Sequence, residues 1–113
     1  MNIDTDTGVL DVVVVGSGPA GLASAIAARK RGLACVVLEK GALVNSILNF
    51  PVNMVFFTTP ELLEIGGLPF VTPHEKPNRD ETLRYYRRVV DAYQLDVRLG
   101  VEVTSIEQQA GDD

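Results

Sequence analysis

Three glycines and one acid in the first third of the chain have the types and spacing to bind a dinucleotide. Gly16, Gly18 and Gly21 form a G-x-G-x-x-G pattern, and Glu39 follows the last of them by 18 residues. In such a pattern the first glycine permits a tight turn, the second leaves room for a pyrophosphate, and the third lets a helix pack closely on a sheet. The acid can accept hydrogen bonds from the adenosine ribose hydroxyls. The spacing therefore predicts FAD or NAD binding, since both ligands carry these groups.

The segments around the glycines make the pattern informative, because this motif needs a strand before it and a helix after it. Residues 11–15 are a β-branched run, typical of a parallel strand that is covered on both faces. Residues 22–31 are alanine-rich and favour a helix, and Gly32 is suited to end it. Residues 33–39 form a second apolar run. The order strand, glycine turn, helix, strand predicts an α/β, Rossmann-like fold with a parallel sheet; a ligand-free βαβ unit is the alternative.

The middle of the chain, residues 40–77, is expected to be irregular. It carries five prolines, which prevent long regular elements, and loops of this length usually serve a function. Thr59, Pro60 and Glu61 could begin a single helical turn, with the threonine as cap.

Regular structure is expected again from residue 78. Asn78 and Glu81 have the spacing of a capping box. An apolar stripe with helical period follows, made of Leu83, Tyr86, Val90 and Tyr93. Short strands are predicted around residues 96–99 and again at 101–106.

These elements predict one incomplete domain. Residues 1–10 are expected to be a disordered lead, and residues 11–113 the N-terminal part of an FAD/NAD(P)-binding domain. It would comprise three parallel strands, a helix on each crossover and an extra strand near the end. The chain has no second glycine fingerprint, so an NADPH domain is expected to be absent from it.

Composition excludes several kinds of partner. The net charge is −5 and the isoelectric point is near 4.7, which argues against nucleic acid as a ligand. Arg84, Arg87 and Arg88 are more consistent with a solvated helix face than with a binding patch. No apolar run is long enough to span a membrane, and residues 1–8 lack the layout of a signal peptide. The single cysteine excludes an internal disulfide and fits a cytoplasmic protein.

No residue stands out as an acid, base, nucleophile or metal ligand. Cys35 lies inside an apolar run, where a buried structural cysteine is expected rather than a redox one. His74 lies in the proline-rich segment without an evident partner, as an exposed loop residue would. A group of large apolar side chains could line a flavin site, but core packing is favoured for them: Phe50, Met54, Phe56 and Phe57.

Further motifs resemble one family. The Pro19-Ala20 variant of the glycine pattern is similar to that of FAD-dependent pyridine-nucleotide oxidoreductases, which favours FAD over NAD. The chain also resembles the YpdA family of thioredoxin-reductase-like flavoproteins, over about residues 10–107. The residues that carry this likeness are Glu39-Lys40-Gly41, Leu43 to Ile47, Phe50-Pro51, Phe56-Phe57, Glu64 to Gly67, Pro69-Phe70, Lys76-Pro77 and Tyr85-Tyr86-Arg87.

The resemblance implies a function for the whole protein. It implies an FAD- and NADPH-dependent oxidoreductase that acts as a cytoplasmic homodimer on a small-molecule redox substrate, with a low-molecular-weight thiol disulfide such as bacillithiol disulfide as the candidate. It also implies a chain about three times this length. The alternatives are a flavoprotein monooxygenase or dehydrogenase with the same N-terminal fold, and a non-catalytic module that binds FAD or NAD.

Twelve residues are predicted to contact the cofactor. The glycine pattern and the acid that answers it supply the first group: Gly16, Ser17, Gly18, Pro19, Ala20, Gly21 and Glu39. The resemblance adds Lys40 and Gly41, which follow the acid. It adds Asn45 and Ser46 near the flavin phosphates and ribityl chain, with ordinary turn residues as the alternative. It also adds Val103, whose strand backbone would meet the adenine, with simple sheet packing as the alternative.

One residue departs from the family. Members of the YpdA family often carry cysteine where this chain has Ala20. Alanine preserves the helix and the pyrophosphate contact, but it excludes thiol–disulfide exchange at that position.

Overall fold

The computed structural model describes residues 9–51, 54–56, 60–73 and 75–108. The greater part of the expected disordered lead therefore lies outside the described residues, and Val9 and Leu10 precede the first strand without regular structure.

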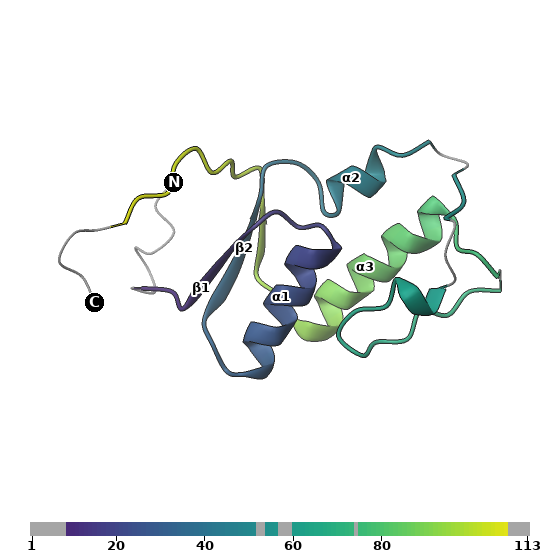
Figure 1. Ribbon diagram of the computed structural model, residues 1–113, viewed down its shortest axis with the longest axis horizontal. Helices are drawn as coiled ribbons and strands as arrows, with labels where there is room; N and C mark the ends of the chain where they lie inside the picture. The colour runs from purple at the N-terminus through teal and green to yellow at the C-terminus, as the bar shows by residue number, and fades with distance from the viewer. Residues whose placement is uncertain (1–8, 52–53, 57–59, 74, 109–113) are drawn as a thin grey trace.

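Three parallel strands form the sheet (Figure 1). β1 (Val12–Val15) pairs with β2 (Cys35–Glu39), and β2 pairs with β3 (Val97–Leu99). The register sets Val12 opposite Cys35 and Val37 opposite Val97. The central strand is therefore β2, and the carboxyl ends of β1 and β2 lie at the same edge, as the predicted βαβ unit requires.

The expectation that residues 11–15 are covered on both faces is wrong for this chain. In β2, Val36, Val37 and Leu38 are buried, but in β1 the side chains of Val13 and Val15 are 43% and 57% exposed. The two strands differ because β2 has a neighbour on each side, whereas β1 is at the edge of the described sheet and helices cover only one of its faces.

α1 packs on that face against β1 and β2, and α3 lies beside α1 (Figure 1). α1 (Pro19–Lys30) begins within the glycine pattern and is followed by Gly32, whose φ of 72° suits glycine, as predicted. α3 (Arg79–Tyr93) begins at Asn78, and the predicted capping box is present with both of its hydrogen bonds.

The middle segment contains only short helices among its described residues. α2 (Asn45–Leu48) is one turn, and Pro60–Leu62 is a 3₁₀ turn. The second turn agrees with the one predicted at Pro60, while the proposed cap Thr59 lies outside the described residues.

The core is formed by α1, the turn at α2, α3 and the loop of residues 63–70. The predicted apolar stripe of α3 is partly wrong. Leu83 and Tyr86 are buried as predicted, but Val90 and Tyr93 are only half-buried. Tyr85 and Val89, which the prediction did not include, are buried instead. The loop explains the shift. The Tyr86 hydroxyl donates to Leu63 O at 2.8 Å, and the Tyr85 hydroxyl donates to Leu68 O at 2.7 Å, so α3 turns these rings toward the loop.

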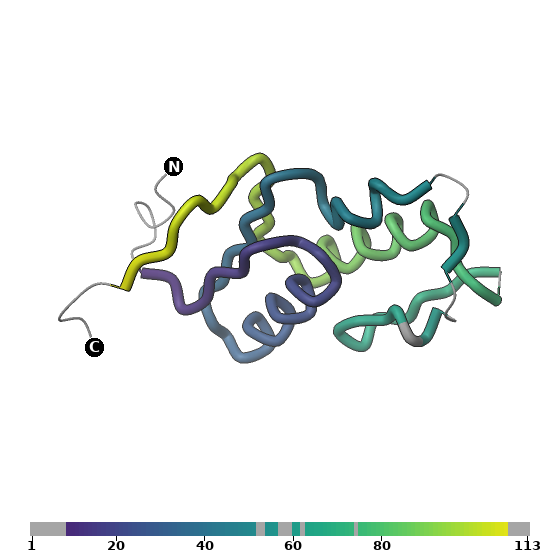
Figure 2. Tube along the Cα trace, turned by 45° about the horizontal axis from the view of Figure 1, so that its top comes forward, coloured from purple at the N-terminus to yellow at the C-terminus, as the bar shows by residue number. Residues whose placement is uncertain are grey.

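The predicted strand at residues 101–106 is wrong. Val101 N–H donates to Glu39 O at 3.0 Å, but residues 101–108 form no strand. Figure 2 shows this yellow segment running back past the purple β1. A strand needs a ladder of backbone partners, and no described segment pairs with this one.

Within the described part of the chain, no helix has the length and apolar character needed to cross a membrane.

Candidate functional site

A hollow of about 390 Å³ opens at the carboxyl ends of β1 and β2. In parallel α/β sheets this edge is where ligands bind. Four segments of the chain line it: Val15, Gly16, Ser17, Gly18, Leu38, Glu39, Lys40, Asn45, Ser46, Val101, Glu102 and Val103.

The three glycines have different surroundings. Gly16 has a φ of 101°, a conformation that favours glycine, and it turns the chain off β1. A Cβ on Gly21 would lie 2.2 Å from Gly16 O, so only glycine lets α1 approach the turn this closely. A Cβ on Gly18 would meet nothing within 4 Å. The space over Gly18 is therefore open, as binding of a pyrophosphate there requires.

The start of α1 forms one wall of the hollow and is suited to an anion. Gly18 is the N-cap and makes no side-chain capping bond, and Pro19 follows it. No acid occupies the first turn. The positive end of the helix dipole and the backbone N–H groups of this turn thus have no carboxylate of their own, which favours phosphate oxygens.

Glu39 is the charged group at the end of β2, and its side chain is 7% exposed. Oε1 accepts from Ser17 N–H at 2.9 Å and from the Ser17 hydroxyl at 2.8 Å, while Oε2 accepts from Gly41 N–H at 2.8 Å. Burial raises the pKa of Glu39, but the hydrogen bonds from Gly41 and Ser17 and the nearby Lys40 outweigh it and hold the pKa below its usual range. Glu39 is therefore ionised at neutral pH.

The free capacity of this carboxylate is small. A carboxylate offers about four lone-pair sites. Among the described residues, the Glu39 carboxylate accepts three hydrogen bonds from protein donors, two of them at Oε1. The remaining acceptor site is on Oε2, which can take one ligand hydroxyl.

The opposite wall begins after β2. Asn45 Oδ1 accepts from Ala42 N–H at 3.2 Å, and a Cβ on Gly41 would lie 2.7 Å from the same oxygen. The glycine thus allows this tight turn into α2. Ser46 and Lys40 are exposed at the rim.

The structure brings most of the predicted site residues together. The hollow is not lined by Pro19, Ala20, Gly21 or Gly41, but it is lined by the other predicted residues. Val103 reaches it from an irregular segment instead of the predicted strand. Four lining residues were not predicted, namely Val15, Leu38, Val101 and Glu102, although Val15 and Leu38 precede the motif positions directly and could have been inferred from them.

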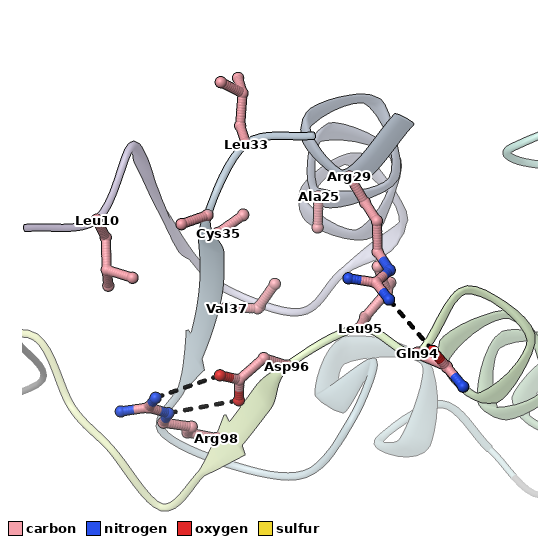
Figure 3. Close-up of a pocket in the computed structure, with 11 residues that line it drawn as sticks. Leu10, Ala25, Arg29, Leu33, Cys35, Val37, Gln94, Leu95, Asp96 and Arg98 are labelled. Atoms are coloured by element: carbon pink, nitrogen blue, oxygen red, sulfur yellow. Dashed lines mark hydrogen bonds and ion pairs between the residues drawn. The ribbon is translucent and has the colours of Figure 1, made fainter. Parts of the chain in front are cut away.

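Cys35 lies at the opposite edge of the sheet, in a second hollow of about 280 Å³ (Figure 3). The thiol is half-buried, not buried as predicted, because Cys35 is the first residue of β2 and α1 covers the strand only beyond this point. Burial and the negative charge of Asp96 raise the pKa of Cys35 above its ordinary value. A thiol in this state is a poor nucleophile at neutral pH, which disfavours a redox role.

The other individually discussed residues add no chemistry to either hollow. Phe50 and Phe56 pack on the core with ring centroids 5.9 Å apart, as favoured from the sequence. Met54 is half-buried, and Phe57 and His74 lie outside the described residues. In the described ranges, no group of three or more His, Cys, Asp or Glu side chains is placed to hold a metal ion.

The fold is shared with a known family of enzymes. Residues 13–112 match the pyridine nucleotide-disulphide oxidoreductase family. The match covers most of the chain, and the chain belongs to this family.

Particular relatives narrow the comparison. The chain is 46% identical to the bacilliredoxin reductase Bdr of Bacillus subtilis (strain 168), over 69% of this chain and 24% of that protein. Two solved bacillithiol disulfide reductases Bdr (YpdA) are also similar. The one from Staphylococcus aureus is 37% identical with a TM-score of 0.87, over 88% of this chain and 31% of that one. The one from Bacillus cereus is 40% identical with a TM-score of 0.87, over 89% and 31%.

A flavin-containing monooxygenase from Stenotrophomonas maltophilia shares the architecture at lower identity. It is 25% identical with a TM-score of 0.80, over 89% of this chain and 31% of that chain. The chain thus spans only about a quarter to a third of the length of its relatives. It covers part of their common fold, and the resemblance to the YpdA family predicted from the sequence is confirmed.

Proposed function

We propose that the chain is the FAD-binding portion of an NADPH-dependent flavoprotein oxidoreductase. The hollow at the carboxyl ends of β1 and β2 supports this proposal. It combines open space over Gly18, an uncapped helix start and an ionised carboxylate at Glu39. These groups match the pyrophosphate and the adenosine ribose of a dinucleotide.

Each group would hold a different part of FAD. The loop from Gly16 to Gly21 would take the pyrophosphate, and Glu39 Oε2 would accept from one ribose hydroxyl. Asn45 and Ser46 would lie toward the ribityl side, and the backbone near Val103 toward the adenine. The bound flavin supplies the hydride chemistry, whereas the residues of this chain bind and orient it.

The NADPH site is proposed to lie outside this chain, since the sequence has a single glycine fingerprint. For the electron acceptor we propose a low-molecular-weight thiol disulfide such as bacillithiol disulfide. The support is the name of the relatives, bacillithiol disulfide reductases. From the resemblance to the YpdA family we also propose a cytoplasmic homodimer, which size-exclusion chromatography with light scattering would check.

A monooxygenase or oxidase is the second candidate. Ala20 provides no thiol at the fingerprint, and the raised pKa of Cys35 makes that thiol a poor substitute. A similar fold occurs in a flavin-containing monooxygenase. If no cysteine elsewhere in the protein serves, reduced flavin would pass its electrons to oxygen or a quinone instead.

The test uses the full-length protein that contains this chain. Released cofactor is identified by chromatography after denaturation, and NADPH consumption is measured with bacillithiol disulfide and with oxygen. We expect FAD, and disulfide-dependent NADPH consumption. A colourless protein that binds NADH but not FAD would overturn the proposal. The second candidate would be favoured by two results together: the wild-type protein consumes NADPH with oxygen but not with the disulfide, and Ala20→Cys gains consumption with the disulfide.

A further inference from the structure

Ser17 occupies the variable position between the first two glycines of the fingerprint, and it is fully buried. The turn itself needs only a small residue there. The hydroxyl is bonded to two other segments of the chain. Its bonds therefore call for an explanation beyond the turn.

The hydroxyl joins the two walls of the hollow. It donates to Glu39 Oε1 at 2.8 Å and accepts from Val44 N–H at 3.2 Å. The Val44 N–H also lies 3.2 Å from Ser17 O. One buried side chain thus contacts the end of β2 and the start of α2, which are separated from it by 22 and 27 residues.

On the Glu39 side, the hydroxyl fixes which oxygen is available. With Oε1 held by two donors from Ser17, Oε2 is left as the oxygen with remaining acceptor capacity. A hydrogen bond from a hydroxyl to a buried carboxylate is stronger than one between neutral groups. The carboxylate is consequently pre-oriented before any ligand arrives, which avoids a cost of ordering on binding.

On the α2 side, the hydroxyl supports a strained residue. Val44 has φ 45° and ψ 50°, which is unfavourable for a β-branched side chain, and that side chain is 1% exposed. Such a conformation persists only where the surroundings enforce it. Asn45 and Ser46, which line the hollow, follow Val44 directly.

We propose that Ser17 is a positioning residue for the adenosine ribose: its hydroxyl holds Glu39 so that Oε2 faces the ligand, and it ties the start of α2 to the same carboxylate. This inference rests on the proposed function, because it requires a ribose-bearing ligand in this hollow. It assigns to Ser17 a role carried by its side chain, distinct from the backbone contacts that any fingerprint residue can make.

The experiment measures FAD affinity by titration calorimetry on the full-length protein freed of flavin. Ser17→Ala should weaken FAD binding about tenfold, the size of one hydrogen bond to a charged group. In a Glu39→Gln background the same change should cost less than about twofold, because the group through which Ser17 acts is already altered. An equal loss in both backgrounds would overturn the inference and leave Ser17 a packing residue.

A second readout separates positioning from general damage. ADP and 2′,3′-dideoxyadenosine diphosphate differ in the ribose hydroxyls alone. The affinity ratio between them should fall in Ser17→Ala, whereas a merely structural loss would weaken both equally and contradict the inference. If Ser17→Ala does not fold, the isosteric pair Ser17→Thr and Ser17→Val decides: the threonine variant should bind FAD about tenfold more tightly than the valine variant.

The outcomes also separate the two proposals. A wild-type protein that binds no FAD would overturn the proposed function. If the wild-type protein binds FAD and Ser17→Ala binds it equally tightly, the role of Ser17 is overturned while the proposed function stands.

Discussion

The two hollows at opposite edges of the same sheet differ in what their polar groups are doing. At the carboxyl edge, the start of α1 is uncapped and Glu39 Oε2 retains acceptor capacity. At the amino edge, Arg98 pairs with Asp96 at 3.2 Å and Arg29 donates to Gln94 at 3.2 Å (Figure 3). One edge presents groups prepared for a ligand, and at the other these polar groups are paired with each other.

The titratable groups differ in the same way. Hydrogen bonds hold the pKa of Glu39 below its usual range, so its charge is kept, while burial and Asp96 raise the pKa of Cys35, so its thiol stays neutral. A hollow by itself is therefore weak evidence of function. Convergent donors and a maintained charge at the carboxyl edge of a parallel sheet are stronger evidence.

The largest expected effect comes from closing the space over Gly18. Gly18→Val in the full-length protein should weaken FAD binding by about a hundredfold or more, the upper end of what an inserted side chain costs in a packed site. The apoprotein should lose only about 1 kcal/mol of unfolding free energy, from a poorer N-cap. Titration with FAD and chemical denaturation measure the two quantities.

Gly32→Ala is the matched control. Its positive φ of 72° should cost a similar amount of stability at the far end of α1, with FAD affinity unchanged. Normal FAD binding by Gly18→Val would place the pyrophosphate elsewhere.

Gly21 tests the fold rather than the ligand. Gly21→Ala should reduce the unfolding free energy by about 1–3 kcal/mol or more, because the new Cβ would lie 2.2 Å from Gly16 O. Gly18→Ala adds the same methyl group where nothing lies within 4 Å and should change stability by less than about 1 kcal/mol. Equal unfolding free energies for the two variants would contradict this distinction.

Glu39 should make stability depend on pH. Its pKa in the folded protein is below the usual 4.5, so its contribution is complete above that value and is lost as the pH falls through the lowered pKa. Glu39→Gln should destabilise the apoprotein by about 1–3 kcal/mol at pH 7, because an amide NH₂ would oppose an N–H donor of Ser17 or Gly41. The difference from wild type should shrink in denaturation curves measured as the pH falls below 4.5 and through the lowered pKa. A difference independent of pH would argue against ionised Glu39.

The smallest effect is expected at the amino edge. Cys35→Ser should change disulfide-dependent NADPH consumption by the full-length enzyme by less than about twofold, since a thiol with a raised pKa is little ionised at neutral pH. A loss of turnover with FAD content preserved would assign a redox role to Cys35 and would remove the contrast between the two hollows.

Much of the fold follows from local sequence. The glycine pattern, the apolar runs on either side and the capping box at Asn78 each act over a few residues, so β1, α1, β2 and α3 could be located in advance. The strand at residues 101–106 could not be judged in this way, because strand formation depends on a partner that is distant in sequence.

The sequence by itself determined which residues could bind a dinucleotide, because glycine conformations and the positive end of a helix are local properties. The tertiary structure decided how those residues are held. It brought Ser17 to Glu39 and Val44 to Ser17, buried Tyr85 and Val89, and placed Val103 at the hollow without a strand. It also left Val13 and Val15 exposed on β1. These outcomes depend on contacts between distant segments, and the spacing of residues along one segment carries no information about which side chains meet across the sheet.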